Sequence, residues 1–193
     1  NVVVLFNIGN VMEMGWIDEY ESIKAAAIIW IPGEFGMTAV AQVLNGEVNP
    51  SGKLADTVAY KVSDHPSGVC FGTNEYDGGE YYVEYLEGIY VGYRYFETVS
   101  AAKDNVAYPF GYGLSYTKFE ITAEKPVMKN EKIIIGCSVK NIGKIAGKEV
   151  AQLYVKHPLS GVLRPALELK GFKKTKKLKV DEKQEFNFSL SES

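Results

Sequence analysis

The run IIIGCSV at residues 133–139 decides the fold of the C-terminal part of the chain. Its apolar side chains at Ile133, Ile135, Cys137 and Val139 recur at every second position. A period of two is typical of a strand with one buried face. The alternation returns in three later runs, which are spaced by turn clusters (151–155, 167–169 and 186–190). Short alternating strands of this kind predict an antiparallel β sandwich.

The N-terminal part has a different pattern. Residues 2–6 (VVVLF) form a continuous apolar run, which is typical of a strand buried on both faces, as in a parallel sheet. Residues 28–31 (IIWI) predict a second buried strand, stopped by a Pro-Gly pair. Residues 38–44 predict a short helix that ends at Asn45-Gly46. Strand, loop and helix in this order predict an α/β unit, and the pattern changes between residues 117 and 127.

Between these regions lie a predicted extended segment at 54–60 and a predicted long loop at 61–79, rich in Ser, Asp, Pro and Gly. Loops of this length in a compact protein are often functional. An acidic and aromatic stretch follows at 80–96, and a glycine-punctuated aromatic turn at 108–116.

Composition excludes some classes of partner. The 193 residues carry a formal net charge of −3, so no global field attracts nucleic acid or an anionic membrane. No apolar run approaches the roughly 20 residues that cross a bilayer. The lysine run at 170–179 is interpreted as the solvated edge of a strand. We therefore expect neither a nucleic-acid nor a membrane partner.

The chain offers few metal ligands. Cys70 and Cys137 form no CxxC pair, and we interpret both as buried or idle thiols, with a disulfide or a metal site as the alternative. His65 and His157 each precede a proline and are expected at the surface. No metal and no cofactor is predicted.

Carboxylates are dense in one region only, at Glu75, Asp77, Glu80, Glu84 and Glu87. Two carboxylates about 5 Å apart can carry out retaining glycoside hydrolysis, but sequence spacing does not show such a distance. For Glu87, the last of these carboxylates, a structural ion pair with Arg94 is the simpler interpretation.

A second candidate segment is PGEFG at 32–36, between a predicted strand and a predicted helix. It lacks the glycine spacing of a phosphate loop, and Glu34 places a negative charge where a phosphate would bind. A loop that lines a sugar is compatible with the same position.

The ends of the chain suggest a larger protein. The sequence begins with Asn1 directly before a strand-like run, without an initiator methionine, and stops at Ser193 directly after another. We expect a fragment of a longer protein. Its compartment stays open between cytoplasmic and secreted.

Several motifs resemble those of family 3 glycoside hydrolases, in the same order as in that family. They are NPSGKL at 49–54, EGIYVGYRYF at 87–96, YPFGYGLSY at 108–116, VKNIG at 139–143, AGKEVAQLYV at 146–155 and the segment 164–172. The resemblance implies a partial, flavodoxin-like α/β sandwich domain at 1–117. An immunoglobulin-like, fibronectin type III-like β sandwich follows at 118–193.

The resemblance also implies an activity. The family contains retaining β-glucosidase-like enzymes that hydrolyse terminal β-linked glucosides or xylosides without a metal. A TIM-like barrel supplies the aspartate nucleophile, and a segment upstream of the strand at 2–6 supplies the acid/base glutamate. The chain matches neither, so we expect no catalytic residue in it and no activity of the chain alone. The expected partners are this barrel and a β-linked oligosaccharide or glycoside substrate.

The family's C-terminal lobe contributes loops around the sugar. This makes Glu34, Phe35, Glu75 and Tyr76 the candidate substrate-binding residues. Phe35 stands where the family usually has a small residue, so the shape of this loop is expected to differ.

A second hypothesis is a non-catalytic carbohydrate-binding or adhesive module. Its support is the tyrosine-rich stretch at 80–96, which would be its sugar platform. Calorimetry with glucose and cellobiose separates the two hypotheses, because a binding module binds sugar without any barrel.

Overall fold

A computed structural model describes residues 1–69, 74–75, 78–157 and 163–191. The chain forms two compact units. Unit 1 comprises Asn1–Met37, Leu54–Tyr112 and His157–Leu167, and unit 2 comprises Thr38–Lys53, Gly113–Lys156 and Glu168–Ser193.

Unit 1 begins with a two-stranded parallel sheet of β1 (Val2–Phe6) and β2 (Ile23–Ile28), joined through the short helix η1 (Gly15–Glu19). The predicted strand at 2–6 and its parallel pairing are confirmed. The prediction of the second strand at 28–31 is wrong, because β2 lies earlier in the chain and ends at Ile28. Trp30 has a φ of 53°, which is incompatible with extended backbone. The apolar run therefore continues past the end of the strand.

Helix α1 (Gly33–Leu44) follows, and its residues from Thr38 onward belong to unit 2. Residues 33–36, predicted as a loop, form its first turn, so the predicted start at residue 38 is wrong. Glu34 lies in this turn, where a negative charge interacts favourably with the helix dipole. The predicted end is confirmed: the backbone N–H of Asn45 donates to Ala41, and Gly46 has a φ of 83°.

The rest of unit 1 consists of short elements. The predicted extended segment at 54–60 reduces to β3 (Val58–Ala59), which pairs with β6 (Val106–Tyr108). The predicted loop at 61–79 contains short elements of its own. The remaining elements are η2 (Val62–Asp64), η3 (Pro66–Val69), β4 (Asn74–Glu75), β5 (Tyr81–Tyr82), α2 (Tyr93–Thr98) and η4 (Ser100–Asn105).

Two small clusters of buried apolar side chains support unit 1. The first contains Phe6, Met14, Ile17 and Val58. The second contains Ala59, Phe96 and Ala102. Adjacent residues of β3, Val58 and Ala59, thus pack into different clusters, as expected of side chains that alternate along a strand.

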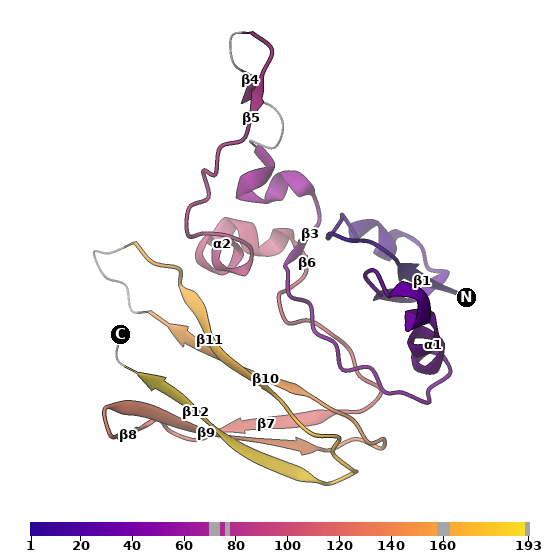
Figure 1. The fold of residues 1–193 in the computed structure, drawn as a ribbon, viewed down its shortest axis with the longest axis vertical. Coiled ribbons are helices and arrows are strands. Elements are labelled where there is room, and N and C mark those ends of the chain that lie inside the picture. Colours follow the sequence, from indigo (N-terminus) through magenta and orange to yellow (C-terminus); the bar gives the residue numbers. More distant parts are fainter. Residues whose placement is uncertain (70–73, 76–77, 158–162, 192–193) are drawn as a thin grey trace. The chain divides into compact units, whose positions relative to one another are not determined.

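Unit 2 is a β sandwich. One sheet contains β12, β9 and β7 in that order, with β8 also paired to β9, and the other contains β10 and β11. Figure 1 shows the two sheets as separate layers. The strands are β7 (Phe119–Ala123), β8 (Val127–Lys129), β9 (Lys132–Asn141), β10 (Val150–Lys156), β11 (Leu167–Lys174) and β12 (Lys183–Ser191).

The core of the sandwich follows the sequence period. Ile135, Cys137 and Val139 of β9 are buried together with Ala151, Leu178 and Phe188. Residues 134, 136, 138 and 140 are less buried than their buried neighbours. The predicted alternation and the predicted all-β fold of this part are confirmed.

Cys137 provides a test of this core. It is a free thiol that is 7% exposed, and its burial raises its pKa. Burial limits the access of a thiol reagent, and the raised pKa lowers the fraction of thiolate, which is the form that attacks the reagent. In a Cys70→Ser variant, we expect labelling of Cys137 in the native chain to be at least about 100-fold slower than in urea. Equal rates with and without urea would contradict the buried placement.

The lysine run makes contacts within unit 2. The ammonium of Lys173 donates to the carbonyl of Asn187 at 2.8 Å and lies within 6 Å of two phenylalanine rings. Lys170 pairs with Glu168 at 3.0 Å, and Lys176 pairs with Glu182 at 2.7 Å. These contacts fit a strand edge that is stabilised within its own unit.

In the described part of the chain, no helix has both the length and the apolar character to span a bilayer.

Candidate functional site

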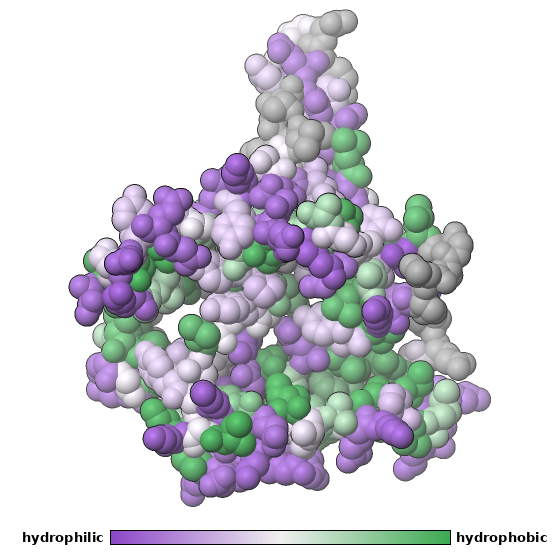
Figure 2. Space-filling model, turned by 180° about the vertical axis from the view of Figure 1, so that it is seen from behind, coloured by the Kyte–Doolittle hydropathy of each residue, from purple (hydrophilic) through white to green (hydrophobic). Residues whose placement is uncertain are grey.

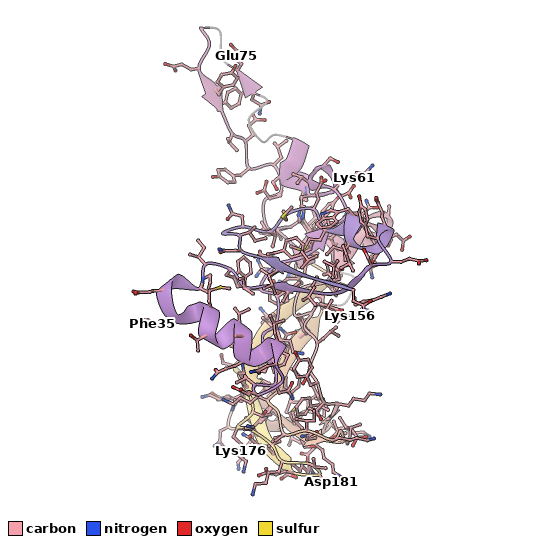
Figure 3. All side chains as sticks on the ribbon, turned by 90° about the vertical axis from the view of Figure 1, so that its right-hand side faces the viewer. Phe35, Lys61, Glu75, Lys156, Lys176 and Asp181 are labelled. Atoms are coloured by element: carbon pink, nitrogen blue, oxygen red, sulfur yellow. The ribbon has the colours of Figure 1, made fainter. Side chains whose placement is uncertain are left out.

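The predicted substrate-binding residues that the structure describes lie in two segments of unit 1. Glu34 and Phe35 belong to the first turn of α1, and Phe35 is 80% exposed. Glu75 lies on β4 opposite Tyr81 and is also exposed. Figure 3 shows Phe35 at the start of α1 and Glu75 on the β4–β5 hairpin, well apart. Tyr76 lies outside the described residues, so the proposed role of these residues stays a prediction.

The predicted ion pair between Glu87 and Arg94 is wrong for the conformation described. No ion pair of the described residues joins them, and both Glu87 Oε2 and Arg94 Nε are buried without a hydrogen-bond partner there. Gly88 and Gly92, with φ of 54° and 56°, redirect the backbone between them. The guanidinium of Arg94 instead lies 5.9 Å from the centre of the Tyr93 ring.

A cavity of about 290 Å³ lies within unit 1. Three segments line it, at 11–13, 56–67 and 87–92. Its polar lining includes Glu13, Asp56, Thr57, His65 and Glu87, and its apolar lining consists mainly of valines. Of the predicted substrate-binding residues that the structure describes, Glu34, Phe35 and Glu75, none lines it. Sequence reasoning missed the cavity, because its three segments are far apart in the chain and only Glu87 belonged to a noted cluster.

Hydrogen bonds fix part of the cavity wall. Glu13 Oε1 accepts from the backbone N–H of Val62 at 2.7 Å. Asp64 Oδ2 accepts from the backbone N–H of Lys61 at 3.0 Å and holds the turn that leads to His65. The wall is therefore organised by the protein itself.

His65 is part of this wall, and its imidazole packs against an aromatic side chain. Its ring meets Phe96 edge to face, with 5.1 Å between ring centres. Burial lowers the pKa of His65, although the carboxylates of Asp64 and Asp56 act in the opposite direction. The neutral imidazole, with one donor and one acceptor nitrogen, is therefore the dominant form at neutral pH.

Residues 49–53 of the NPSGKL segment lie in unit 2 and make structural contacts there. Asn49 Oδ1 accepts from the hydroxyl of Ser115 and the backbone N–H of Tyr116, each at 2.9 Å. Its amide nitrogen donates to the carbonyl of Ala146 at 3.3 Å. One side chain thus joins the segment to two other parts of unit 2.

Lys53 completes this set of contacts. Its ammonium lies 2.9 Å from Glu149 Oε1 and donates to the carbonyl of Gly113 at 2.8 Å. Both side chains of the pair are mostly buried. The motif is therefore a structural connection in unit 2, and its lysine and asparagine are engaged with the protein.

Metal ligation finds no support in the described residues. They contain no group of three or more His, Cys, Asp or Glu side chains placed to hold a metal ion.

Comparison with known proteins gives two domain matches. The chain matches the Glycosyl hydrolase family 3 C-terminal domain over residues 1–116 and the Fibronectin type III-like domain over residues 149–193. It is 46% identical over 191 residues to a beta-glucosidase of Ruminococcus albus, which covers 99% of the chain and 19% of that relative.

Solved structures agree. A beta-glucosidase from Paenibacillus barengoltzii matches 97% of the chain with a TM-score of 0.88 and 40% identity. Beta-glucosidase 3B from Thermotoga neapolitana in complex with glucose matches 97% with a TM-score of 0.86 and 38% identity. The chain spans only 20% and 25% of these two proteins. The chain belongs to glycosyl hydrolase family 3, in which it corresponds to the C-terminal domain followed by a fibronectin type III-like domain.

Proposed function

We propose that this chain is the C-terminal region of a retaining β-glycosidase that hydrolyses terminal β-linked glucosides or xylosides. The support is that proteins named beta-glucosidase match it over nearly its whole length, at 46% identity in the case of Ruminococcus albus. The chain spans about a fifth of that relative, so most of the relative has no counterpart in it. The catalytic pair and the barrel are assigned to that remaining part.

The parallel sheet of unit 1 supports a role within a larger protein. Val2 and Val3 of β1 are 45% and 50% exposed, although parallel strands are normally covered on both faces. Unit 1 has other exposed large apolar side chains, among them Ile31, Phe35 and Leu86. Figure 2 shows hydrophobic side chains at the surface, among hydrophilic ones. A TIM-like barrel domain of the same protein is the partner that we propose for such surfaces.

The proposed domain boundary lies between residues 117 and 118, at the change from short mixed elements to long strands. Within this scheme the chain contributes scaffold and loops rather than catalytic groups. Glu34, Phe35, Glu75 and Tyr76 are the residues that we propose to border the sugar of the whole enzyme. The exposure of Glu34, Phe35 and Glu75 leaves them available to a ligand held mainly by another domain.

Activity measurements test this proposal. The isolated chain is expected to give no hydrolysis of chromogenic β-glucosides above the buffer rate, because both catalytic carboxylates are assigned elsewhere. A chimera that joins it to the remaining part of the Ruminococcus albus relative is expected to restore turnover. That remaining part alone serves as the control. Turnover by the isolated chain would overturn the assignment of the catalytic pair.

A further inference from the structure

Helix α1 is followed directly by an asparagine and a glycine. Asn45 and Gly46 come after the last helical residue, Leu44, and both are exposed. Asn45 is the only asparagine of the sequence that precedes a glycine. Because glycine has no Cβ, a neighbouring side chain can approach its backbone nitrogen closely. This pair is therefore the place in the chain where an asparagine side chain can react most easily with the backbone.

Hydrogen bonds hold the Asn45 amide close to that backbone. Its Oδ1 accepts from the backbone N–H of Glu47 at 3.0 Å, and its Nδ2 donates to Glu47 Oε1 at 2.8 Å. A bond from a side chain to the N–H two residues later folds the amide back over the peptide between them, which is the peptide of Gly46. The N–H of Glu47 also polarises the amide carbonyl and stabilises the negative charge that develops on Oδ1 during nucleophilic attack.

The backbone of Gly46 is only weakly restrained. A Cβ added to this residue would meet no atom within 4 Å, so no packed neighbour confines it. Its N–H donates to the carbonyl of Val43 at 3.1 Å, and this bond must break before the nitrogen can react. The same carbonyl accepts from the hydroxyl of Tyr116 at 2.8 Å. Breaking the bond thus leaves the carbonyl with a partner, and the exposed N–H turns to water.

We propose that Asn45 is a site of spontaneous deamidation in the native chain. The backbone nitrogen of Gly46 loses its proton to hydroxide and bonds to Cγ of Asn45. The bond from Cγ to Nδ2 breaks, and the amide nitrogen takes up a proton from water and leaves as ammonia. Water then opens the resulting ring at one of its two carbonyls, which gives aspartate or isoaspartate. The whole change consumes water and releases ammonia, and it does not depend on the proposed activity.

The product changes the end of α1. A carboxylate at position 45 lies just after the C-terminus of the helix, where the helix dipole disfavours a negative charge. It also replaces the amide that donates to Glu47 Oε1, so that two carboxylates meet. The end of α1, which the Tyr116 hydroxyl contacts at Val43, is therefore expected to open more easily within unit 2.

Incubation of the full chain tests the modification itself. Protease digestion with mass spectrometry locates the converted residue, and an isoaspartate-specific methyltransferase identifies the isomerised product. We expect conversion at Asn45, faster at mildly alkaline than at neutral pH, because the attacking nitrogen must be deprotonated. Asn130 and Asn187 are exposed asparagines of the same unit that precede Glu and Phe, and they serve as internal controls. They are expected to react at least about tenfold more slowly.

The effect on unit 2 is tested with Asn45→Asp, which has the structure of one product. In the Cys70→Ser background, labelling of Cys137 at intermediate urea is expected to be about two- to fivefold faster than in the parent. Adding Glu47→Gln should recover part of this change. Asn187→Asp is the matched control and should label at the parental rate. Fluorescence of Trp16 and Trp30, which both lie in unit 1, should be unchanged.

Several results would overturn the proposal. Conversion of Asn45 in urea without conversion in the native chain would show that the bond to Val43 protects it. Equal conversion of Asn130 or Asn187 would remove the selectivity for Asn45. Parental labelling of Cys137 in Asn45→Asp would contradict the expected opening at the end of α1.

Discussion

Replacing Asn141 by alanine is expected to lower the free energy of unfolding of unit 2 by about 3–4 kcal/mol. Asn141 ends β9 and is 0% exposed. Its Oδ1 accepts from the hydroxyl of Thr117 at 2.8 Å and from the backbone N–H of Gly143 at 3.1 Å. Its amide nitrogen donates to the carbonyls of Ile145 and Leu178 at 2.8 and 3.1 Å. The amide therefore uses all of its usual hydrogen-bonding groups in the interior.

The size of the effect follows from what the substitution leaves behind. The carbonyl of Leu178 keeps the N–H of Gly147 as a partner. The hydroxyl of Thr117, which is 8% exposed, loses its acceptor, and the N–H of Gly143 and the carbonyl of Ile145 lose their side-chain partners at partly buried hydrogen bonds. Each such group costs about 1–3 kcal/mol. Asn141→Asp is not a conservative change, since it retains the acceptor, loses both donors and buries a charge.

The measurement uses the thiol of Cys137, which lies in the core of the same unit. Its labelling in a Cys70→Ser background, as a function of urea, reports the opening of unit 2, while tryptophan fluorescence reports unit 1. Asn187→Ala is the matched control, because Asn187 lies on β12 and its side chain is exposed. We expect a change within about 0.5 kcal/mol for the control. A loss at Asn141 as small as that would contradict its role as a hydrogen-bonding centre.

The sequence predicted those parts of the fold that a local period determines. The strands at 2–6 and at 133–139 have clear patterns, and the structure contains both. The predicted burial of the first strand on both faces is wrong for Val2 and Val3, which are exposed. The end of β2 depends instead on the backbone of Trp30, which has a positive φ that composition does not show. The apolar run at 28–31 therefore did not show where the strand ends, and its last two residues, Trp30 and Ile31, are exposed rather than buried.

The site was less accessible to sequence reasoning, for a different physical reason. The cavity lining combines residues such as Glu13, Thr57 and Glu87, which only the tertiary fold brings together. The pairing of Glu87 with Arg94 followed from charge alone, whereas no ion pair of the described residues joins them. Resemblance identified the family through NPSGKL, but it did not show that Asn49 and Lys53 act through contacts in unit 2.

Replacing Lys53 by methionine is expected to lower the stability of unit 2 by about 2–3 kcal/mol. The side chains of Lys53 and Glu149 are only 17% and 14% exposed, so the substitution leaves a largely buried carboxylate without its cation. The carbonyl of Gly113 loses its donor as well. Loss of one partner of a fully buried pair costs about 3–5 kcal/mol, and the remaining exposure to water reduces that figure here. The same Cys137 labelling in urea measures the change.

A double-mutant cycle with Glu149→Leu identifies the source of this loss. Glu149→Leu alone should cost less than Lys53→Met, because the long lysine stem can turn its ammonium toward water whereas the carboxylate stays fixed by the N–H of Val150 at 2.7 Å. The double variant should recover part of the loss, since it buries no unpaired charge. Lys183→Met, which breaks an exposed pair with Glu185, is the control and should change little. Simple additivity of the two single variants would show that Lys53 stabilises unit 2 through Gly113 and packing rather than through Glu149.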